Sequence, residues 1–206
     1  MRIVLTMLRP EELAERLQAL GHTVAHRPLV AVEPLGDEPV DVSGYDWVVL
    51  TSVVGAQELR RRLEGTPSRV AAIGAATAAA FGGADLVPRV STQEGLLAEL
   101  PRPAGRVLFA GAEGARRLLA DELGADVVPL YRTVELEPEQ PLEGDLVVLA
   151  SPSAARAYAR TGASHPAVSI GPETTAAAQE LGIEVAAEAA THDVDGLVSA
   201  IVATAG

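Results

Sequence analysis

The sequence predicts an α/β protein built from two domains, each with a parallel β-sheet. Apolar segments of strand length alternate with segments of helical periodicity, which is the pattern of strands joined by crossover helices. Landmark segments then recur in the same order, offset by about 100 residues, as expected for a duplication at the scale of a domain. The 206 residues are enough for two such domains, each with its own core.

The first half of the chain alternates strands and helices. Strands are expected at residues 2–6, 23–32, 47–51, 70–73 and 86–88. Helices are expected from Pro10 to a C-cap at Gly21, after the third strand through Leu63, after Gly74, and from Thr92 through Leu100. Leu13, Leu17 and Leu20 share one face of the first helix. The acidic segment 33–46, with its prolines and glycines, predicts a connector.

The second half repeats these landmarks, and the helix expected at 115–123 follows the first repeated strand. The matched segments are Arg106–Ala110 with Arg2–Thr6, Val127–Leu130 with the strand at 23–32, Val147–Ser151 with Val48–Ser52, Val168–Gly171 with Ala71–Gly74, and Gly196–Val198 with Gly95–Leu97. The two copies differ at one chemically useful position: Pro129-Leu130-Tyr131 carries a phenol where Pro28-Leu29-Val30 carries an aliphatic side chain.

The composition excludes several kinds of chemistry. All 16 basic residues are arginine, so no lysine can form a Schiff base, hold pyridoxal phosphate or complete a P-loop. The absence of cysteine excludes disulfides, thiolate nucleophiles and thiolate metal sites. The four histidines, His22, His26, His165 and His192, form no ligand pair at helical spacing, so we expect no metal site.

The charge and hydropathy patterns bear on partners and location. A net charge of −12 disfavours nucleic-acid and acidic-membrane surfaces, although helix N-termini and local arginines can still hold a small anion. No apolar run approaches the roughly 20 residues of a membrane helix, and the apolar start is too short for a signal peptide. We expect a cytoplasmic monomer without nucleic-acid or membrane partners. Arg60-Arg61-Arg62 predicts a solvated helix face, with a weak anion patch as the alternative.

Small hydroxyls and glycines follow the same strands in both copies. They are Thr51, Ser52, Gly74 and Thr77 in one copy and Ser151, Ser153, Gly171 and Thr174 in the other. Each precedes a helix, so the hydroxyls either cap that helix only or join its free amides in binding carboxylates or phosphates. Ligands of open parallel sheets lie beyond the carboxyl ends of the strands. The repetition on two domains favours a cleft between them that holds an anion.

Tyr131 is the other candidate side chain. Its ring either packs at the end of a strand with its hydroxyl in water, or supplies a general acid held near a leaving group. No dinucleotide fingerprint is present, since Gly82-Gly83 and Gly111-Ala112-Glu113-Gly114 lack its spacing. Neither Ser52 nor Ser151 lies in a G-x-S-x-G elbow.

Taken in order, these motifs resemble the uroporphyrinogen-III synthase family over essentially the whole chain. The matching segments are Val49-Leu50-Thr51-Ser52, Ile73-Gly74 with Thr77, Gly95-Leu96, Leu130-Tyr131-Arg132-Thr133, Ala150-Ser151-Pro152-Ser153-Ala154, Ile170-Gly171-Pro172 with Thr174, and Gly196-Leu197. The chain departs from the family where Met7-Leu8 separates Thr6 from Arg9-Pro10, and where Glu173 takes the place of the first of two threonines.

The resemblance implies a discontinuous domain organisation. One domain then combines residues 1–33 and 135–206, and the other is the inserted segment 37–128. Residues 28–36 and 129–134 would form two antiparallel connecting strands.

The resemblance also implies a reaction. Members of the family cyclise the linear tetrapyrrole hydroxymethylbilane to uroporphyrinogen III, losing water and inverting ring D through a spiro intermediate, without a cofactor. On this basis Tyr131 is expected to be the acid that assists departure of the hydroxyl. Contacts to the substrate carboxylates are expected from Thr51, Ser52, Gly74, Thr77, Ser151, Ser153, Gly171 and Thr174.

Two other functions stay open at this point. A non-catalytic, two-lobed ligand-binding module, binding a tetrapyrrole or acting as a sensor, would have the same architecture. A nucleotide-dependent enzyme is disfavoured by the missing phosphate loop and dinucleotide fingerprint.

Overall fold

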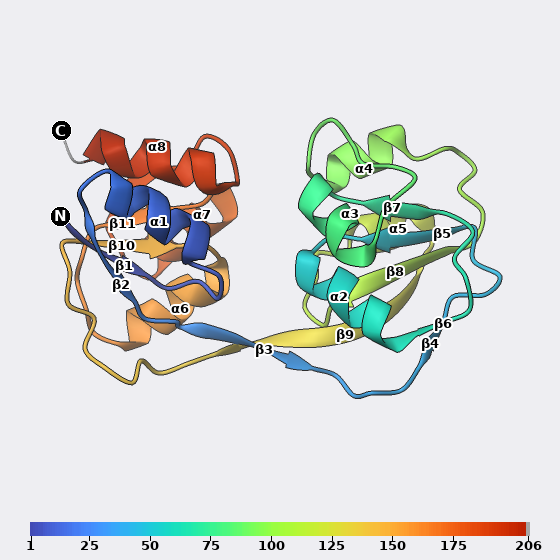
Figure 1. Ribbon diagram of the computed structural model, residues 1–206, viewed down its shortest axis with the longest axis horizontal. Helices are drawn as coiled ribbons and strands as arrows, with labels where there is room; N and C mark the ends of the chain where they lie inside the picture. The colour runs from blue at the N-terminus through green and yellow to red at the C-terminus, as the bar shows by residue number, and fades with distance from the viewer. Residues whose placement is uncertain (205–206) are drawn as a thin grey trace. The chain divides into compact units, whose positions relative to one another are not determined.

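The computed structural model describes residues 1–204 and divides the chain into two compact units. Unit 1 comprises residues 1–31 and the chain from residue 134 onward, and unit 2 comprises residues 32–133. Each unit is a β-sheet with helices on both faces (Figure 1). The chain therefore passes from one unit to the other twice, at residues 31–32 and 133–134.

Unit 1 contains a five-stranded sheet in the order β12-β11-β10-β1-β2, and all its neighbouring strands run parallel. The strands are β1 (Arg2–Leu5), β2 (Thr23–His26), β10 (Leu146–Leu149), β11 (Ala167–Ser169) and β12 (Val185–Glu188). The helices are α1 (Glu11–Ala19), α6 (Pro152–Arg160), α7 (Pro172–Glu180) and α8 (Val194–Thr204).

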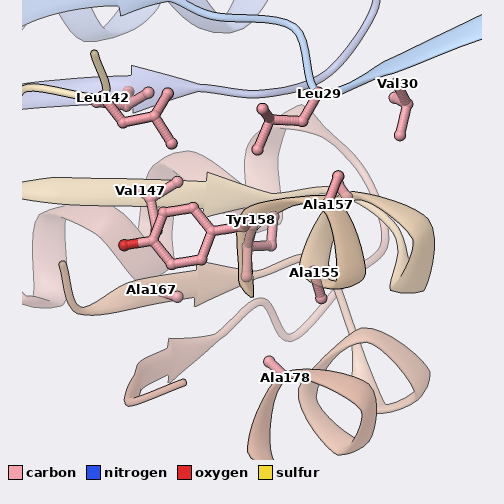
Figure 2. Packing of buried hydrophobic residues seen from close by; sticks show 12 residues of the cluster. Leu29, Val30, Leu142, Val147, Ala155, Ala157, Tyr158, Ala167 and Ala178 are labelled. Atoms are coloured by element: carbon pink, nitrogen blue, oxygen red, sulfur yellow. The ribbon is translucent and has the colours of Figure 1, made fainter. Parts of the chain in front are cut away.

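The sheet of unit 1 separates two apolar cores. Along β10, Leu146 and Val148 pack with α1 and α8, whereas Val147 and Leu149 pack with α6 and α7. Figure 2 shows part of the second core, where Tyr158 lies beside Val147 and Ala167. A central parallel strand is buried on both faces, which explains why its sequence is a continuous apolar run.

Unit 2 has the sheet order β3-β9-β8-β5-β7. Its strands are β3 (Val30–Pro34), β5 (Trp47–Leu50), β7 (Val70–Ala72), β8 (Val107–Ala112) and β9 (Asp126–Glu135), and a separate pair joins β4 (Val40–Asp41) to β6 (Leu63–Glu64). Its helices are α2 (Val53–Arg62), α3 (Ala75–Phe81), α4 (Gln93–Glu99) and α5 (Leu118–Leu123). Val48 and Leu50 pack towards α2 and α3, and Trp47 and Val49 towards α4 and α5.

The two sheets share one strand order. In unit 1 the order across the sheet is β12-β11-β10-β1-β2. In unit 2 the matching order is Leu86-β7-β5-β8-β9, where Leu86 forms a parallel bridge with Ala71 of β7. In unit 2 the five segments come from one stretch of chain, whereas in unit 1 the first two strands and the last three come from opposite ends of the sequence.

The expected strand at 23–32 is wrong, because two strands of different sheets occupy this segment. β2 pairs with β1 as far as His26, and β3 starts at Val30 beside β9. Pro28 between them has no N–H to continue a ladder. Leu20 was also expected on the buried face of α1, but the helix ends at Ala19 and Leu20 is 53% exposed.

The arginine triplet at the end of α2 is a solvated face only in part, because Arg60 and Arg61 are exposed but Arg62 is not. Arg62 is only 9% exposed, and its guanidinium donates hydrogen bonds to the carbonyl oxygens of Leu35 and Glu38. Arg61 pairs with Asp37 and Glu58. These contacts fix residues 35–38 against the C-terminus of α2, where positive charge also complements the helix dipole.

Gly196, near the start of α8, is expected to tolerate no side chain. A Cβ there would lie 2.1 Å from the carbonyl oxygen of Thr191, whereas a Cβ at Gly114 would meet nothing within 4 Å. We expect Gly196→Ala to lower the free energy of unfolding by about 1–3 kcal/mol, because backbone must move. Gly114→Ala is the control and should change it by less than about 0.5 kcal/mol. Urea unfolding followed by circular dichroism measures both, and equal midpoints would contradict the prediction.

Candidate active site

Tyr131 and Ser52 meet at the carboxyl ends of the strands of unit 2. The oxygen atoms of their hydroxyls lie 2.9 Å apart, at hydrogen-bond distance. Ser52 follows β5 and is the N-cap of α2, where its Oγ accepts the N–H of Gly55 at 2.9 Å. Tyr131 lies on β9 and is 8% exposed. The structure thus brings together a predicted acid and a predicted binding residue that are 79 positions apart in sequence.

An irregularity in β9 sets the direction of the Tyr131 side chain. Gly111 of β8 is paired with Pro129, but the next residue, Ala112, is paired with Tyr131, so Leu130 is an extra residue in β9. Leu130 and Tyr131 are consequently both buried, against the alternation of a regular strand. Pro129 cannot donate to the ladder, which makes this a favourable place for the bulge.

The corresponding place in unit 1 has the cap without the phenol. Ser151 is the N-cap of α6, and its Oγ accepts the N–H of Ala154 at 3.2 Å. Val30 stands at the sequence position that matches Tyr131, and it packs in the apolar core with Ala154. Within residues 1–204, the capping hydroxyl of Ser52 is thus bonded to a phenol, whereas that of Ser151 is not.

Thr77 and Thr174 occupy matching places, each at the third residue of its helix, α3 and α7. They are 4% and 3% exposed, yet the structure shows no hydrogen bond from either hydroxyl to another of residues 1–204. Other buried hydroxyls are engaged: Thr6 donates to the carbonyl oxygen of Val148 at 2.6 Å, and Ser169 lies 2.6 Å from the Thr175 hydroxyl. Thr77 and Thr174 therefore keep hydrogen-bonding capacity for a ligand.

The remaining predicted residues take more varied positions. Gly74 and Gly171 are the N-caps of α3 and α7, without a side chain to satisfy the helix amides. Thr51 lies between β5 and α2 and is half-buried. Ser153 lies in the first turn of α6, where its hydroxyl accepts a hydrogen bond from Arg156, which also binds Glu135. Its hydroxyl is thus less available than those of the threonines.

The structure draws attention to His192, which the sequence shows only as a scattered histidine. A Cβ on Gly171 would lie 2.5 Å from Nε2 of His192, so the imidazole rests against the backbone at the start of α7. In unit 2 the matching neighbour of Gly74 is Ser91, whose Oγ would lie 3.3 Å from such a Cβ. Aligning the copies at Gly95 and Gly196 places His192 opposite Ser91. The internal repeat could therefore have indicated His192 as a residue at the edge of the site.

An ionised carboxylate follows His192 directly. Asp193 accepts hydrogen bonds from the backbone N–H of Gly196 and from the Thr191 hydroxyl, both at 2.8 Å. These two bonds, the first above all, hold the pKa of Asp193 below its ordinary value near 3.8. The start of α8 is therefore capped by a fixed negative charge, and an anion there must compete with it.

The site residues fall into two groups, one in each unit. Unit 2 contributes Thr51, Ser52, Gly74, Thr77 and Tyr131, and unit 1 contributes Ser151, Ser153, Gly171 and Thr174. Within each sheet the strands named here are parallel, so their carboxyl ends share one edge. This combination of a parallel sheet, capped helix N-termini and hydroxyls defines an α/β protein suited to binding anions.

Comparisons with known proteins specify the class further. The model of the family "Uroporphyrinogen-III synthase HemD" matches residues 11–199, and the chain belongs to that family. A uroporphyrinogen-III synthase of Synechococcus elongatus is 29% identical over 233 residues, covering 91% of this chain and 88% of that protein. A crystal structure of a mutant uroporphyrinogen III synthase from the extremely thermophilic bacterium Thermus thermophilus has a similar fold, with a TM-score of 0.63 at 18% identity, covering 99% of this chain and 98% of that chain.

The family match confirms the α/β fold expected from the resemblance and the enzyme class. Among residues 1–204, no helix has both the length and the apolar character that crossing a membrane requires.

Replacing Thr77 or Thr174 by valine removes a hydroxyl while nearly keeping the volume. We expect each change to alter the free energy of unfolding by less than about 1 kcal/mol, because no internal hydrogen bond is lost. The KM for a polycarboxylate substrate should rise about 10–100-fold, because a hydrogen bond to a charged group typically contributes that factor to the affinity.

Thr6→Val is the matched control for this pair, since it removes a hydroxyl that is bonded to Val148. It should cost about 1–3 kcal/mol of unfolding free energy. Steady-state kinetics and urea unfolding separate the two effects. An unchanged KM in both Thr77→Val and Thr174→Val would contradict a binding role.

Proposed function

We propose that this chain cyclises hydroxymethylbilane to uroporphyrinogen III, with loss of water and inversion of ring D through a spiro intermediate, and that Tyr131 is the general acid of the first step. The family match over residues 11–199 supports the overall reaction. The observation that carries the role of Tyr131 is its phenol, held by Ser52 at the start of α2 and at the carboxyl edge of the sheet.

The first chemical task is to release the terminal hydroxyl of the substrate. Hydroxide is a poor leaving group, and a proton from the Tyr131 Oη would let it depart as water. The resulting electrophilic azafulvene is then attacked by the substituted carbon of ring D. The cyclised product then loses a proton, and this proton can return the Tyr131 phenolate to a phenol. The net loss from the substrate is therefore one water. A positioned acid of this kind typically accelerates a step by about 10²–10⁴-fold.

The second task is to hold a flexible substrate in the geometry that inverts ring D. Without the enzyme, closure gives the uninverted isomer, so conformation decides the product. The substrate has eight carboxylates, and the free hydroxyls of Thr77 and Thr174 are suited to bind them, together with amides at the helix N-termini. Ser151, Gly74 and Gly171 lie at such N-termini. Holding reacting atoms in place can lower a barrier by several kcal/mol.

The binding-module alternative is not favoured. The chain belongs to an enzyme family, and the phenol that distinguishes unit 2 from unit 1 supplies a reactive group that a purely binding function would not require. Action without a cofactor, a cytoplasmic location and a monomeric state stay predictions.

A coupled assay tests the reaction. Hydroxymethylbilane is generated in situ, the protein is added, and the oxidised uroporphyrin isomers are separated by chromatography. Isomer III should exceed isomer I, because the enzyme must impose the inverted closure. If the folded protein yields isomer I only, the synthase assignment is wrong.

Replacing Tyr131 by phenylalanine tests the acid. The rate of isomer III formation should fall about 10²-fold or more, since the proton donor is lost while the ring remains. The control is Tyr45→Phe, which removes a phenol hydroxyl bonded to Asp126 at the start of β9, the other end of the same sheet. Its turnover should match the parent protein. Equal kinetics of Tyr131→Phe and Tyr45→Phe would remove Tyr131 from the mechanism.

A further inference from the structure

We propose that Ser52 is a positioning residue that donates its hydroxyl proton to the Tyr131 oxygen and so connects the phenol to the N-terminus of α2. The inference rests on the proposed function, in which Tyr131 gives up a proton. Ser52 would then act on the phenolate that this step leaves behind, rather than on a carboxylate of the substrate.

The hydrogen-bond geometry at Ser52 supports this direction. A serine hydroxyl has one proton to donate and two lone pairs to accept with. One lone pair of Ser52 is occupied by the Gly55 N–H at 2.9 Å. Among the described residues, the other partner of this hydroxyl is Tyr131, also at 2.9 Å. If Tyr131 directs its own proton at the leaving hydroxyl, the proton between the two oxygens must come from Ser52.

The helix supplies the electrostatic reason. α2 runs from Val53 to Arg62, and its N-terminus carries a partial positive charge from unpaired N–H groups. The Gly55 N–H bound to Ser52 polarises the serine O–H, and hydrogen bonds in a chain strengthen one another. Negative charge that develops on Tyr131 is thus stabilised through Ser52. Such a hydrogen bond is stronger to a phenolate than to a phenol, which favours the transition state over the ground state.

Close packing holds this chain of groups in place. A Cβ on Gly55 would lie 3.0 Å from Ser52 Oγ and 3.4 Å from the Cα of Gly111 on β8. A larger residue at this turn would therefore press on the Ser52 hydroxyl and on the backbone of β8. The bulge at Leu130 then directs Tyr131 to the same spot. The helix α2 and the strands β8 and β9 together bring the hydroxyl oxygens of Ser52 and Tyr131 to 2.9 Å.

Unit 1 offers an internal comparison. Ser151 caps α6 as Ser52 caps α2, but Val30 stands where Tyr131 would be. Capping alone therefore explains a serine at this turn in both units. It does not explain the bond to a phenol, which unit 2 adds.

The proton account balances. The O–H bond of Tyr131 breaks as the C–O bond to the leaving hydroxyl breaks, and water departs. The Ser52 O–H bond stays intact and only donates a hydrogen bond to the phenolate. The proton that the substrate loses on cyclisation restores Tyr131, so neither an external acid nor an oxidant is required.

A double-mutant cycle on the full-length protein tests the inference. Ser52→Ala should lower kcat for isomer III by about 10–100-fold with little change in KM, the value of a hydrogen bond to a charged group. In a Tyr131→Phe background the same change should lower kcat less than about 2-fold, because the phenolate is gone. Ser52→Thr should keep kcat within about 3-fold of the parent, since threonine also caps helices and donates.

Loss of a helix cap is controlled with Thr92→Ala. Thr92 caps α4 in the same unit, with its Oγ1 accepting the Gly95 N–H at 3.0 Å. Its unfolding midpoint should fall no more than that of Ser52→Ala, which also loses the bond to Tyr131, and any kinetic effect should be the same in both Tyr131 backgrounds.

Three results would overturn the inference. An equal kcat effect of Ser52→Ala with and without the Tyr131 hydroxyl would mean that Ser52 does not act through Tyr131. A raised KM in both backgrounds would make it a direct substrate contact instead. If the parent protein forms isomer I only, the proposed function fails and the inference fails with it. Isomer III in excess from the parent, combined with additive mutants, would overturn the role of Ser52 alone.

Discussion

The start of every helix at the carboxyl edge of a parallel sheet leaves backbone N–H groups without intrahelical partners. This constraint governs both units. Ser52, Ser151 and Thr92 satisfy it with a hydroxyl, and Asp193 with a carboxylate. α3 and α7 start at glycine instead, and no side chain caps their amides. These turns therefore either use a polar side chain as a cap or leave amides free, and they are also where a parallel sheet presents its ligand site.

Function enters through the polar groups that the fold does not consume. Thr77 and Thr174 are buried near the starts of α3 and α7, whose N-caps are glycines, and the structure shows no hydrogen bond from their hydroxyls within residues 1–204. Neither hydroxyl oxygen is among the fully buried side-chain atoms that lack a partner, so each can reach solvent or a ligand. Two such hydroxyls at matching positions of both units agree with the binding role proposed for them.

The sequence predicts the layers of the fold well because their signals are local. Continuous apolar runs such as Leu146–Leu149 require a strand buried on both faces, and the helices between such runs force parallel pairing. Signals that depend on partners distant in sequence are lost. The hydrogen bonds from Arg62 to the carbonyl oxygens of Leu35 and Glu38 are an example. A triplet of arginines in the sequence does not indicate that one of them has backbone carbonyl partners. The late start of α5 is another: Leu119 N–H is bound by the Gln93 side chain rather than by a cap of its own.

The candidate site divides in the same way. Its residue types could be named from the repeat, since Ser52 and Ser151, or Thr77 and Thr174, match by position. The different roles of the two copies could not be predicted, because they depend on a bulge in β9 that no local sequence pattern indicates. One extra residue in β9 turns Tyr131 towards the cap of α2. Ser52 caps α2 as Ser151 caps α6, but Ser52 also has Tyr131 as a second partner. A helix cap can in this way also support the proposed acid. A duplicated fold can acquire the proposed acid in this way by a changed side chain and one extra residue in one copy, while the cap that would support the acid is already in place.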